Sequence, residues 1–173
     1  MYLPHLTKKE MYKVIFLDID GVLNVYPQGH DEYGPIFHQH FIDNLGYIIE
    51  QTGAKLVISS TWRGSGIEYL RNLWKHRNMP GDIIDITPNC VDVVNSGRCE
   101  FYDTVDRGHE IQQWLDENEV LNYCIIDDDN DMLETQRNNF VRTANNEDHD
   151  DCIDIGYGLT KICSGEVIQI LNS

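Results

Sequence analysis

Two carboxylates, Asp18 and Asp20, directly follow the apolar residues 14–17. A short apolar run bounded by polar residues is typical of a buried strand in a parallel sheet. Open α/β sheets bind their ligands beyond the carboxyl ends of such strands. Two carboxylates one residue apart repel each other unless a cation or a shared proton lies between them. By itself this pattern fits a cation-assisted reaction centre and a strand ending in solvated aspartates about equally.

A second acidic cluster, residues 127–131, follows the apolar run 123–126. Carboxylate oxygens are the ligands that hard cations such as Mg²⁺ and Ca²⁺ prefer. The cluster is not an EF-hand, because Met132 and Asn138 stand where that loop needs Gly and Glu. The sequence therefore offers acidic side chains at the ends of two predicted strands.

Hydroxyl and guanidinium groups follow at two further predicted element ends. Ser59 and Ser60 come directly after the apolar run 55–58, where they could hold a phosphoryl oxygen or cap the next helix. Asp106 is a predicted N-cap, which places Arg107 in the first helical turn. The helix dipole opposes a cation there, so Arg107 indicates a bound anion, with an ordinary surface arginine as the alternative.

An alternation of strands and helices must position these groups. Short apolar runs predict strands at 14–17, 55–58, 83–87, 123–126 and 140–143. Apolar residues at helical spacing predict helices that include 41–49, 67–74, 111–115 and 167–171. Residues 91–93 and 99–101, on either side of Asn95-Ser96-Gly97, predict a small hairpin within an insertion at 88–105.

The composition is that of a globular chain. Its 173 residues, 41% of them hydrophobic, suit one domain over residues 1–173, with 1–12 as an N-terminal extension. No apolar run approaches the ~20 residues that span a bilayer, and the N-terminus lacks a signal-peptide core. The five cysteines are scattered, without a C-x-x-C pair. We therefore expect a soluble, cytoplasmic protein that does not act on membranes.

The net charge of −16 argues against non-specific binding to nucleic acid. The charge is uneven, however. Residues 127–154 hold ten acidic residues against Arg137 and Arg142, whereas residues 52–78 hold five basic residues against Glu68. Such asymmetry is most often a solvated surface, and a basic stretch can also hold a polyanion at the rim of a site.

The string D-I-D-G-V-L-N at residues 18–24 resembles the first motif of the haloacid dehalogenase (HAD) superfamily. Counterparts of the other three motifs follow in order at Ser59, Arg107 and Asp127-Asp128. The string S-S-T-W-R at residues 59–63, and G-L-T before the last predicted helix, are similar to a capless HAD subgroup associated with RNA-repair proteins.

The resemblance implies a fold. It is a three-layer α/β/α sandwich, Rossmann-like, with a mainly parallel five-stranded sheet and no large cap. The implied spatial order of the strands is 140–143, 123–126, 14–17, 55–58, 83–87.

The resemblance also implies catalytic roles. Asp18 would be the nucleophile, and Asp20 the general acid and base. Ser59 and Arg107 would balance the charge on the phosphoryl group, with Ser60 as the alternative to Ser59.

The implied cofactor is Mg²⁺, held by oxygen ligands. Its ligands would be Asp18, the backbone carbonyl of Asp20, and Asp128, with Asp127 as a neighbour or second ligand and Asp131 as a weaker candidate. Ser60 and Arg63 are the expected substrate-binding residues. Trp62 would pack in the core or stack on a base.

The expected function is Mg²⁺-dependent phosphate-ester hydrolysis through an aspartyl-phosphate, with a phosphate at a nucleic-acid end as the favoured substrate. A phosphatase for small molecules or phosphoproteins is the alternative within the same fold. Two other classes are a binding module on an inactive HAD scaffold, which the intact motif residues disfavour, and a receiver-like signalling domain. A receiver needs its phosphorylated Asp on the third strand, which here ends in Ile86-Thr87.

Overall fold

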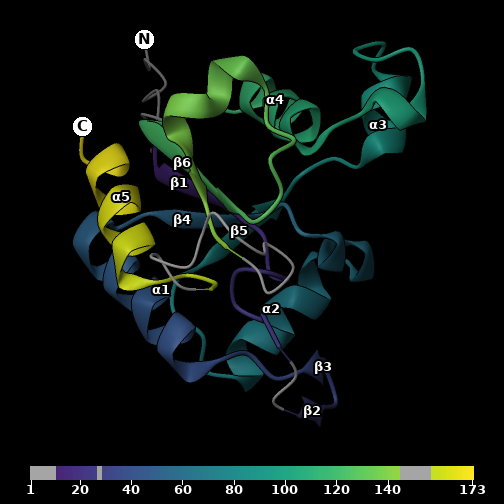
Figure 1. Ribbon diagram of the computed structural model, residues 1–173. Helices are drawn as coiled ribbons and strands as arrows, with labels where there is room; N and C mark the ends of the chain where they lie inside the picture. The colour runs from purple at the N-terminus through teal and green to yellow at the C-terminus, as the bar shows by residue number, and fades with distance from the viewer. Residues whose placement is uncertain (1–10, 27–28, 145–156) are drawn as a thin grey trace, which may run out of the picture.

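The computed structural model describes residues 11–26, 29–144 and 157–173. Within these residues, five parallel strands form the central sheet (Figure 1). In spatial order they are β5 (Ile83–Ile86), β4 (Lys55–Ile58), β1 (Lys13–Leu17), β6 (Asn122–Asp127) and β7 (Phe140–Arg142). The expected α/β class and strand order are therefore confirmed.

The register of the sheet brings three strand ends level. Leu17 in β1 lies opposite both Ile58 in β4 and Ile126 in β6. The backbone N–H of Asp18 continues the ladder by donating to the Ile126 carbonyl at 3.0 Å. The residues that follow these three positions therefore emerge side by side, at the carboxyl edge of the sheet.

Helices cover both faces of the sheet, because β1 alternates its side chains between two cores. Ile15 and Leu17 belong to one core, and Val14 and Phe16 to the other. Figure 1 shows α4 on one side of the sheet and α1, α2 and α5 on the other. Their bounds are α1 Gln39–Thr52, α2 Ile67–His76, α4 Arg107–Glu117 and α5 Lys161–Leu171.

The hairpin expected within residues 88–105 is wrong. Residues Cys90–Asn95 form a short helix, α3, and Tyr102–Thr104 form a 3₁₀ turn, η2. The side chain of Asn89 accepts from the backbone N–H groups of Val91 and Asp92, and the Asp92 side chain accepts from the Asn89 N–H. This capping box starts a helix where the β-branched residues alone favoured a strand. The segment projects away from the sheet (Figure 1).

Two strands of two residues each, β2 (His30–Asp31) and β3 (Gly34–Pro35), form a hairpin between β1 and α1 in the chain. It is fastened to the end of α2 by Arg77, which donates from Nε and Nη2 to the two carboxylate oxygens of Asp31 at 2.9 and 2.7 Å. These hydrogen bonds lower the pKa of Asp31 to about 2. The guanidinium also lies 4.4 Å from the ring centre of Phe37.

Most of the expected N-terminal extension and the acidic stretch after Ala144 lie outside the described residues. Among the helices that the structure describes, none has the length and apolar character needed to cross a membrane.

Candidate active site

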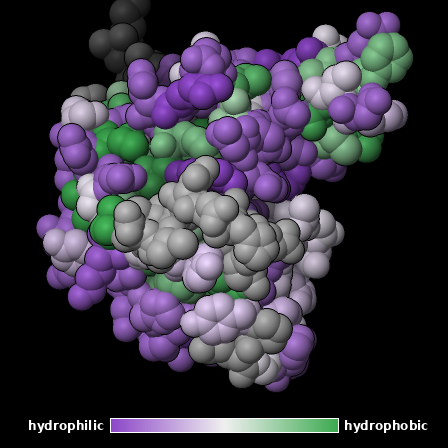
Figure 2. All heavy atoms as spheres, viewed as in Figure 1, coloured by the Kyte–Doolittle hydropathy of each residue, from purple (hydrophilic) through white to green (hydrophobic). Residues whose placement is uncertain are grey.

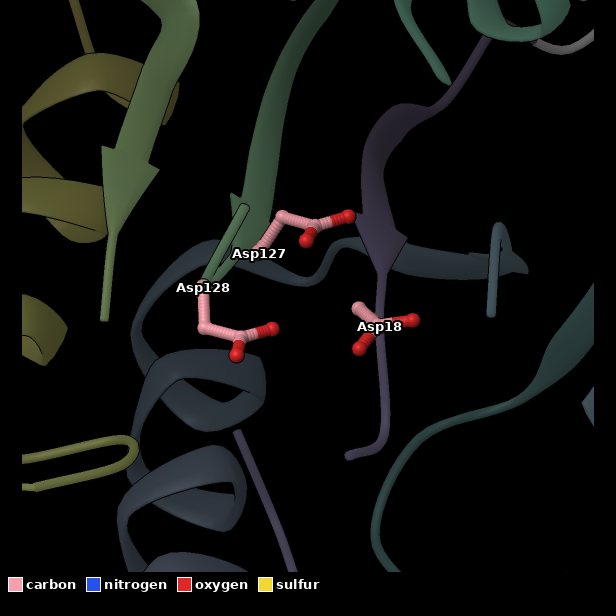
Figure 3. A group of neighbouring side chains, drawn as sticks. All are labelled: Asp18, Asp127 and Asp128. Atoms are coloured by element: carbon pink, nitrogen blue, oxygen red, sulfur yellow. The ribbon is translucent and has the colours of Figure 1, made fainter. Parts of the chain in front are cut away.

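Strands β1 and β6 deliver three carboxylates to one point at the carboxyl edge of the sheet. Asp18 follows β1, Asp127 ends β6, and Asp128 comes next. One oxygen from each lies within 4.8 Å of the others. Figure 3 shows the three side chains facing a common space between the two strand ends. Asp18 and Asp127 are buried, with exposed fractions of 6% and 1%.

Gly21 makes room for this cluster. Its φ of +74° is in the left-handed region, and a methyl group built on its Cα would overlap the carboxyl group of Asp128. The hydroxyl of Thr143 donates to the Gly21 carbonyl at 2.9 Å, which ties the turn after β1 to the end of β7. The glycine of the D-I-D-G string is therefore required both by backbone conformation and by the position of Asp128.

The cluster concentrates negative charge in a buried place. Burial raises the pKa of Asp18 to about 7, with Asp128 adding to the rise and Arg107 opposing it. Burial and the neighbouring Asp18 raise the pKa of Asp127 to about 8, again against Arg107. Oδ2 of Asp127 is buried and has no hydrogen-bond partner among the described residues. Three clustered carboxylates, one of them with an unpartnered oxygen, fit a hard divalent cation such as Mg²⁺.

Arg107 lies near two of these carboxylates. Its Nη2 lies 3.9 Å from Oδ1 of Asp18, and its Nε lies 3.7 Å from Oδ2 of Asp127. Its Nη1 is buried without a hydrogen-bond partner in the part of the chain that the structure describes. The first residue of α4 thus directs a guanidinium into the site with donor capacity left for an anion.

Asp131 holds the beginning of α4 in place. Its Oδ2 accepts from the backbone N–H of Arg107 at 3.1 Å, and its carbonyl accepts from the N–H of Gly108 at 3.2 Å. A carboxylate at a helix N-terminus is favoured by the helix dipole. Asp131 is not one of the three clustered carboxylates, and its two contacts hold the backbone of Arg107 and Gly108.

The structure separates the two serines after β4. The hydroxyl of Ser60 lies beside Asp18 and lowers the pKa of that carboxyl. Oγ of Ser59 is buried and lacks a hydrogen-bond partner in the described residues. The Ser59 backbone is engaged, since its N–H donates to the Leu17 carbonyl at 3.1 Å. Ser60 is thus the hydroxyl beside the expected nucleophile.

Arg63 is committed to a buried ion pair. Its Nη2 lies 2.7 Å from Oε2 of Glu110 on α4, with side chains only 10% and 9% exposed. Its Nη1 donates to the Ser59 carbonyl. Burial lowers the pKa of Arg63 and raises that of Glu110, and the ion pair opposes both shifts. Arg63 therefore connects the loop after β4 to α4, and its Nε is buried without a hydrogen-bond partner among the described residues.

Asp20 lies apart from the three clustered carboxylates and is exposed. Its Oδ1 accepts from Nδ2 of Asn24 at 2.9 Å, and its Oδ2 accepts from Nε1 of Trp62 at 2.8 Å. The turn that carries it is closed by the Gly21 N–H, which donates to the Asn24 carbonyl at 2.8 Å.

Two residues that sequence analysis did not identify support the site from α4 and the loop before β7. Glu110 pairs with Arg63, and Gln136, fully buried, donates from Nε2 to the Gly108 carbonyl at 2.9 Å. Their partners lie far along the chain, so no local pattern marks them. The only signal for Glu110 in the sequence was that it is an acidic residue on the same predicted helix as Arg107.

The basic stretch of residues 52–78 is largely satisfied internally. Arg71 donates to the carbonyls of Ile83 and Ile84 and to Glu68, and Arg77 is held by Asp31. Lys75 is exposed. The stretch therefore provides less free positive charge than its composition suggests.

A parallel α/β sandwich with clustered carboxylates, a hydroxyl and a guanidinium at one edge of its sheet is the arrangement of HAD-type domains. Comparison with known families agrees: the family described as "HAD domain in Swiss Army Knife RNA repair proteins" matches residues 14–147. The chain belongs to this family, and its domain is of the HAD phosphohydrolase type. No curated protein matches the chain.

Proposed function

We propose that this protein is a Mg²⁺-dependent phosphomonoesterase that forms an aspartyl-phosphate on Asp18. The observation that carries the proposal is the position of the Asp18 carboxylate, between the Ser60 hydroxyl, the Arg107 guanidinium and the carboxylates of Asp127 and Asp128. A phosphoryl group placed there meets a nucleophile, hydrogen-bond donors and a cation site together.

The cation would be held by Asp18, Asp127 and Asp128, with the backbone carbonyl of Asp20 as a further oxygen ligand. When bound, Mg²⁺ offsets the charge of the carboxylates and of the phosphate, which would otherwise repel each other. The raised pKa values of Asp18 and Asp127 support this assignment, because they report uncompensated negative charge in a buried place.

The proton and phosphoryl transfers are assigned to two carboxylates. An oxygen of Asp18 attacks phosphorus, the bond to the leaving oxygen breaks, and Asp20 gives that oxygen its proton. Asp20 then takes a proton from a water molecule, whose oxygen attacks the phosphorus and releases Asp18 and inorganic phosphate. Asp20 is suited to this work because its side chain is exposed to the substrate side and lies outside the carboxylate cluster.

Ser60 and Arg107 would stabilise the equatorial oxygens of the phosphoryl group as negative charge develops there. Arg107 supports this role through its buried Nη1, which lacks a hydrogen-bond partner in the described residues. We assign the hydroxyl role to Ser60 in preference to Ser59 because the Ser60 hydroxyl lies beside Asp18 and lowers its pKa.

A phosphate at a nucleic-acid end is the substrate that we favour. The name of the matching family refers to RNA repair. The segments between the site residues are short, which suits an open site that admits a phosphate carried on a large molecule. The alternatives are a small phosphate ester or a phosphoprotein, and a comparison of substrates decides among them.

The proposal is tested by phosphate release from an aryl phosphate and from 3′- and 5′-phosphorylated oligonucleotides, with Mg²⁺ and with EDTA. Activity should require Mg²⁺, and acid quenching should trap a phosphorylated protein. Asp18→Asn should remove both turnover and the trapped phosphate, because the amide has nearly the same shape and is not a nucleophile.

Asp43→Asn, an exposed change on α1, is the matched control and should retain wild-type turnover. Full activity in EDTA, or turnover by Asp18→Asn within about tenfold of wild type, would contradict the mechanism.

A further inference from the structure

The carboxylate of Asp20 is held by two side-chain donors. Nε1 of Trp62 donates to Oδ2 at 2.8 Å, and Nδ2 of Asn24 donates to Oδ1 at 2.9 Å. Asp20 is exposed, so packing alone does not hold its side chain in one orientation. The two hydrogen bonds therefore define where its oxygens lie.

The indole of Trp62 is itself firmly placed. Its ring packs edge-on against Phe37, with centroids 5.6 Å apart, and Phe37 is buried. Phe37 in turn contacts Trp74 of α2 and the guanidinium of Arg77. Gly34 of β3 lies against the edge of the indole, since a methyl group built on it would come within 3.5 Å. The donor to Asp20 is thus anchored to the hydrophobic core and to the β2–β3 hairpin.

Trp62 and Ser60 belong to the same short turn. The backbone N–H of Trp62 donates to Oγ of Ser60 at 3.4 Å, and the Ser60 hydroxyl lies beside Asp18 and lowers its pKa. One segment after β4 therefore contacts both carboxylates of the D-I-D-G string, Asp18 through a hydroxyl and Asp20 through an indole N–H. This arrangement sets the two carboxylates relative to each other.

We propose that Trp62, assisted by Asn24, is the positioning residue that aims Asp20 at the leaving oxygen. The inference rests on the function proposed above and adds the residue that controls its proton transfer. An indole N–H can donate and cannot accept, so Trp62 orients the carboxyl group without competing for its proton. The proton of Asp20 is then left for the leaving oxygen when the ester bond breaks.

The test uses Trp62→Phe, which keeps an aromatic ring against Phe37 and removes the N–H. We compare kcat/KM for an alkyl phosphate with kcat/KM for 2,4-dinitrophenyl phosphate, because kcat/KM reports the first phosphoryl transfer. The alkyl leaving group needs a proton and the dinitrophenolate does not. Since general acid help is worth ~10²–10⁴-fold, we expect a loss of about tenfold or more for the alkyl ester and little change for the aryl ester.

Trp114→Phe is the matched control. It also removes an indole N–H bonded to a carboxylate, Oδ2 of Asp85 at 2.7 Å, but at a site away from the clustered carboxylates. It should leave the ratio of the two kcat/KM values unchanged. In an Asp20→Asn background, Trp62→Phe should cause no further loss, since the residue it positions no longer transfers a proton.

The outcomes separate the two proposals. Equal losses on both esters, or no loss on either, overturn the role of Trp62 while leaving the phosphatase function intact. A wild-type protein that hydrolyses neither ester overturns the function itself. If Trp62→Phe does not fold, Asn24→Ala, a change at a partly exposed residue, should still lower kcat/KM for the alkyl ester selectively. Equal effects of Asn24→Ala on both esters would overturn the proposal that these two side chains position Asp20.

Discussion

At the scale of single residues, two adjacent serines, Ser59 and Ser60, are candidates for the hydroxyl that contacts the phosphoryl group. The resemblance favours Ser59, with Ser60 as the alternative, because both residues follow a buried strand. A strand directs successive side chains to opposite faces, so at most one can face Asp18. The place of the Ser60 hydroxyl beside Asp18 favours Ser60, whereas the Ser59 hydroxyl is buried without a hydrogen-bond partner in the described residues.

Ser60→Ala should therefore lower kcat/KM for an aryl phosphate by about tenfold or more, since a hydrogen bond to a charged group is worth ~1.5–3 kcal/mol. Ser59→Ala should change it much less and serves as the control. Steady-state kinetics of the two variants, with melting temperatures to verify folding, check the prediction. A larger effect for Ser59→Ala would assign the phosphate-binding hydroxyl to Ser59.

The buried carboxylates also predict a pH dependence for the metal-free protein. The pKa of Asp127 is raised by burial to about 8, so the folded state favours its protonated form. Its contribution to stability is present below the unfolded-state pKa and is lost as the pH rises through the folded-state value. The melting temperature in EDTA should therefore fall between about pH 5 and about pH 8.

Asp127→Asn should flatten this fall, because the amide does not ionise. Added Mg²⁺ should raise the melting temperature of the wild type at the higher pH and that of Asp127→Asn much less. Thermal unfolding of both proteins across the pH range measures both effects. Parallel pH profiles for the two proteins in EDTA would show that Asp127 is not the source.

At the scale of elements, the sequence predicted what depends on local patterns. The five strands were recognisable as short apolar runs, and Arg107 stood out because the helix dipole opposes it. The predicted hairpin was wrong because Asn95-Ser96-Gly97 resembles a turn between strands, whereas in the structure it ends a helix that Asn89 begins. The pair Arg63–Glu110 was missed because it joins two elements that only the fold brings together.

The docking of α4 gives a prediction at this scale. A methyl group built on Gly108 would overlap the backbone nitrogen of Leu133, which cannot move aside as a side chain can. Gly108→Ala should displace the start of α4, and with it Arg107. We expect a loss of stability of ~1–3 kcal/mol together with reduced kcat/KM.

Gly165→Ala is the matched control, because this helical glycine on α5 has open space where the methyl group would go. It should leave activity unchanged and raise stability by up to ~1 kcal/mol through helix propensity. Chemical denaturation and steady-state kinetics distinguish the two variants. A Gly108→Ala protein with wild-type stability and activity would show that α4 is not held against this loop.

At the scale of the whole molecule, charge limits how a nucleic acid could bind. The net charge is −16, and Arg71 and Arg77 already have partners within the protein. Long-range electrostatic attraction is therefore weak, and the favoured substrate must be held by short-range contacts. Aromatic side chains supply such contacts, because bases stack on them independently of charge.

The projecting segment between β5 and α4 presents candidate aromatic residues. It follows β5, the edge strand of the sheet, and leads along the chain into α4, whose first residue is Arg107. Phe101 and Tyr102 are 57% and 56% exposed. Figure 2 shows apolar residues at the surface of this projection, beside hydrophilic ones.

We therefore expect kcat/KM for a 3′-phosphorylated oligonucleotide to exceed that for the 3′-mononucleotide. Replacing Phe101 and Tyr102 together by Ala should remove most of this advantage, since stacking is worth ~1–3 kcal/mol per base, and leave mononucleotide turnover intact. Tyr47→Ala, a change at an equally exposed aromatic residue on α1, is the control.

Because few phosphates are neutralised, the advantage of the oligonucleotide should fall by less than about tenfold between about 50 and about 200 mM salt. Equal rates on the two wild-type substrates would exclude the polynucleotide, and an advantage that survives the double replacement would place its binding surface elsewhere.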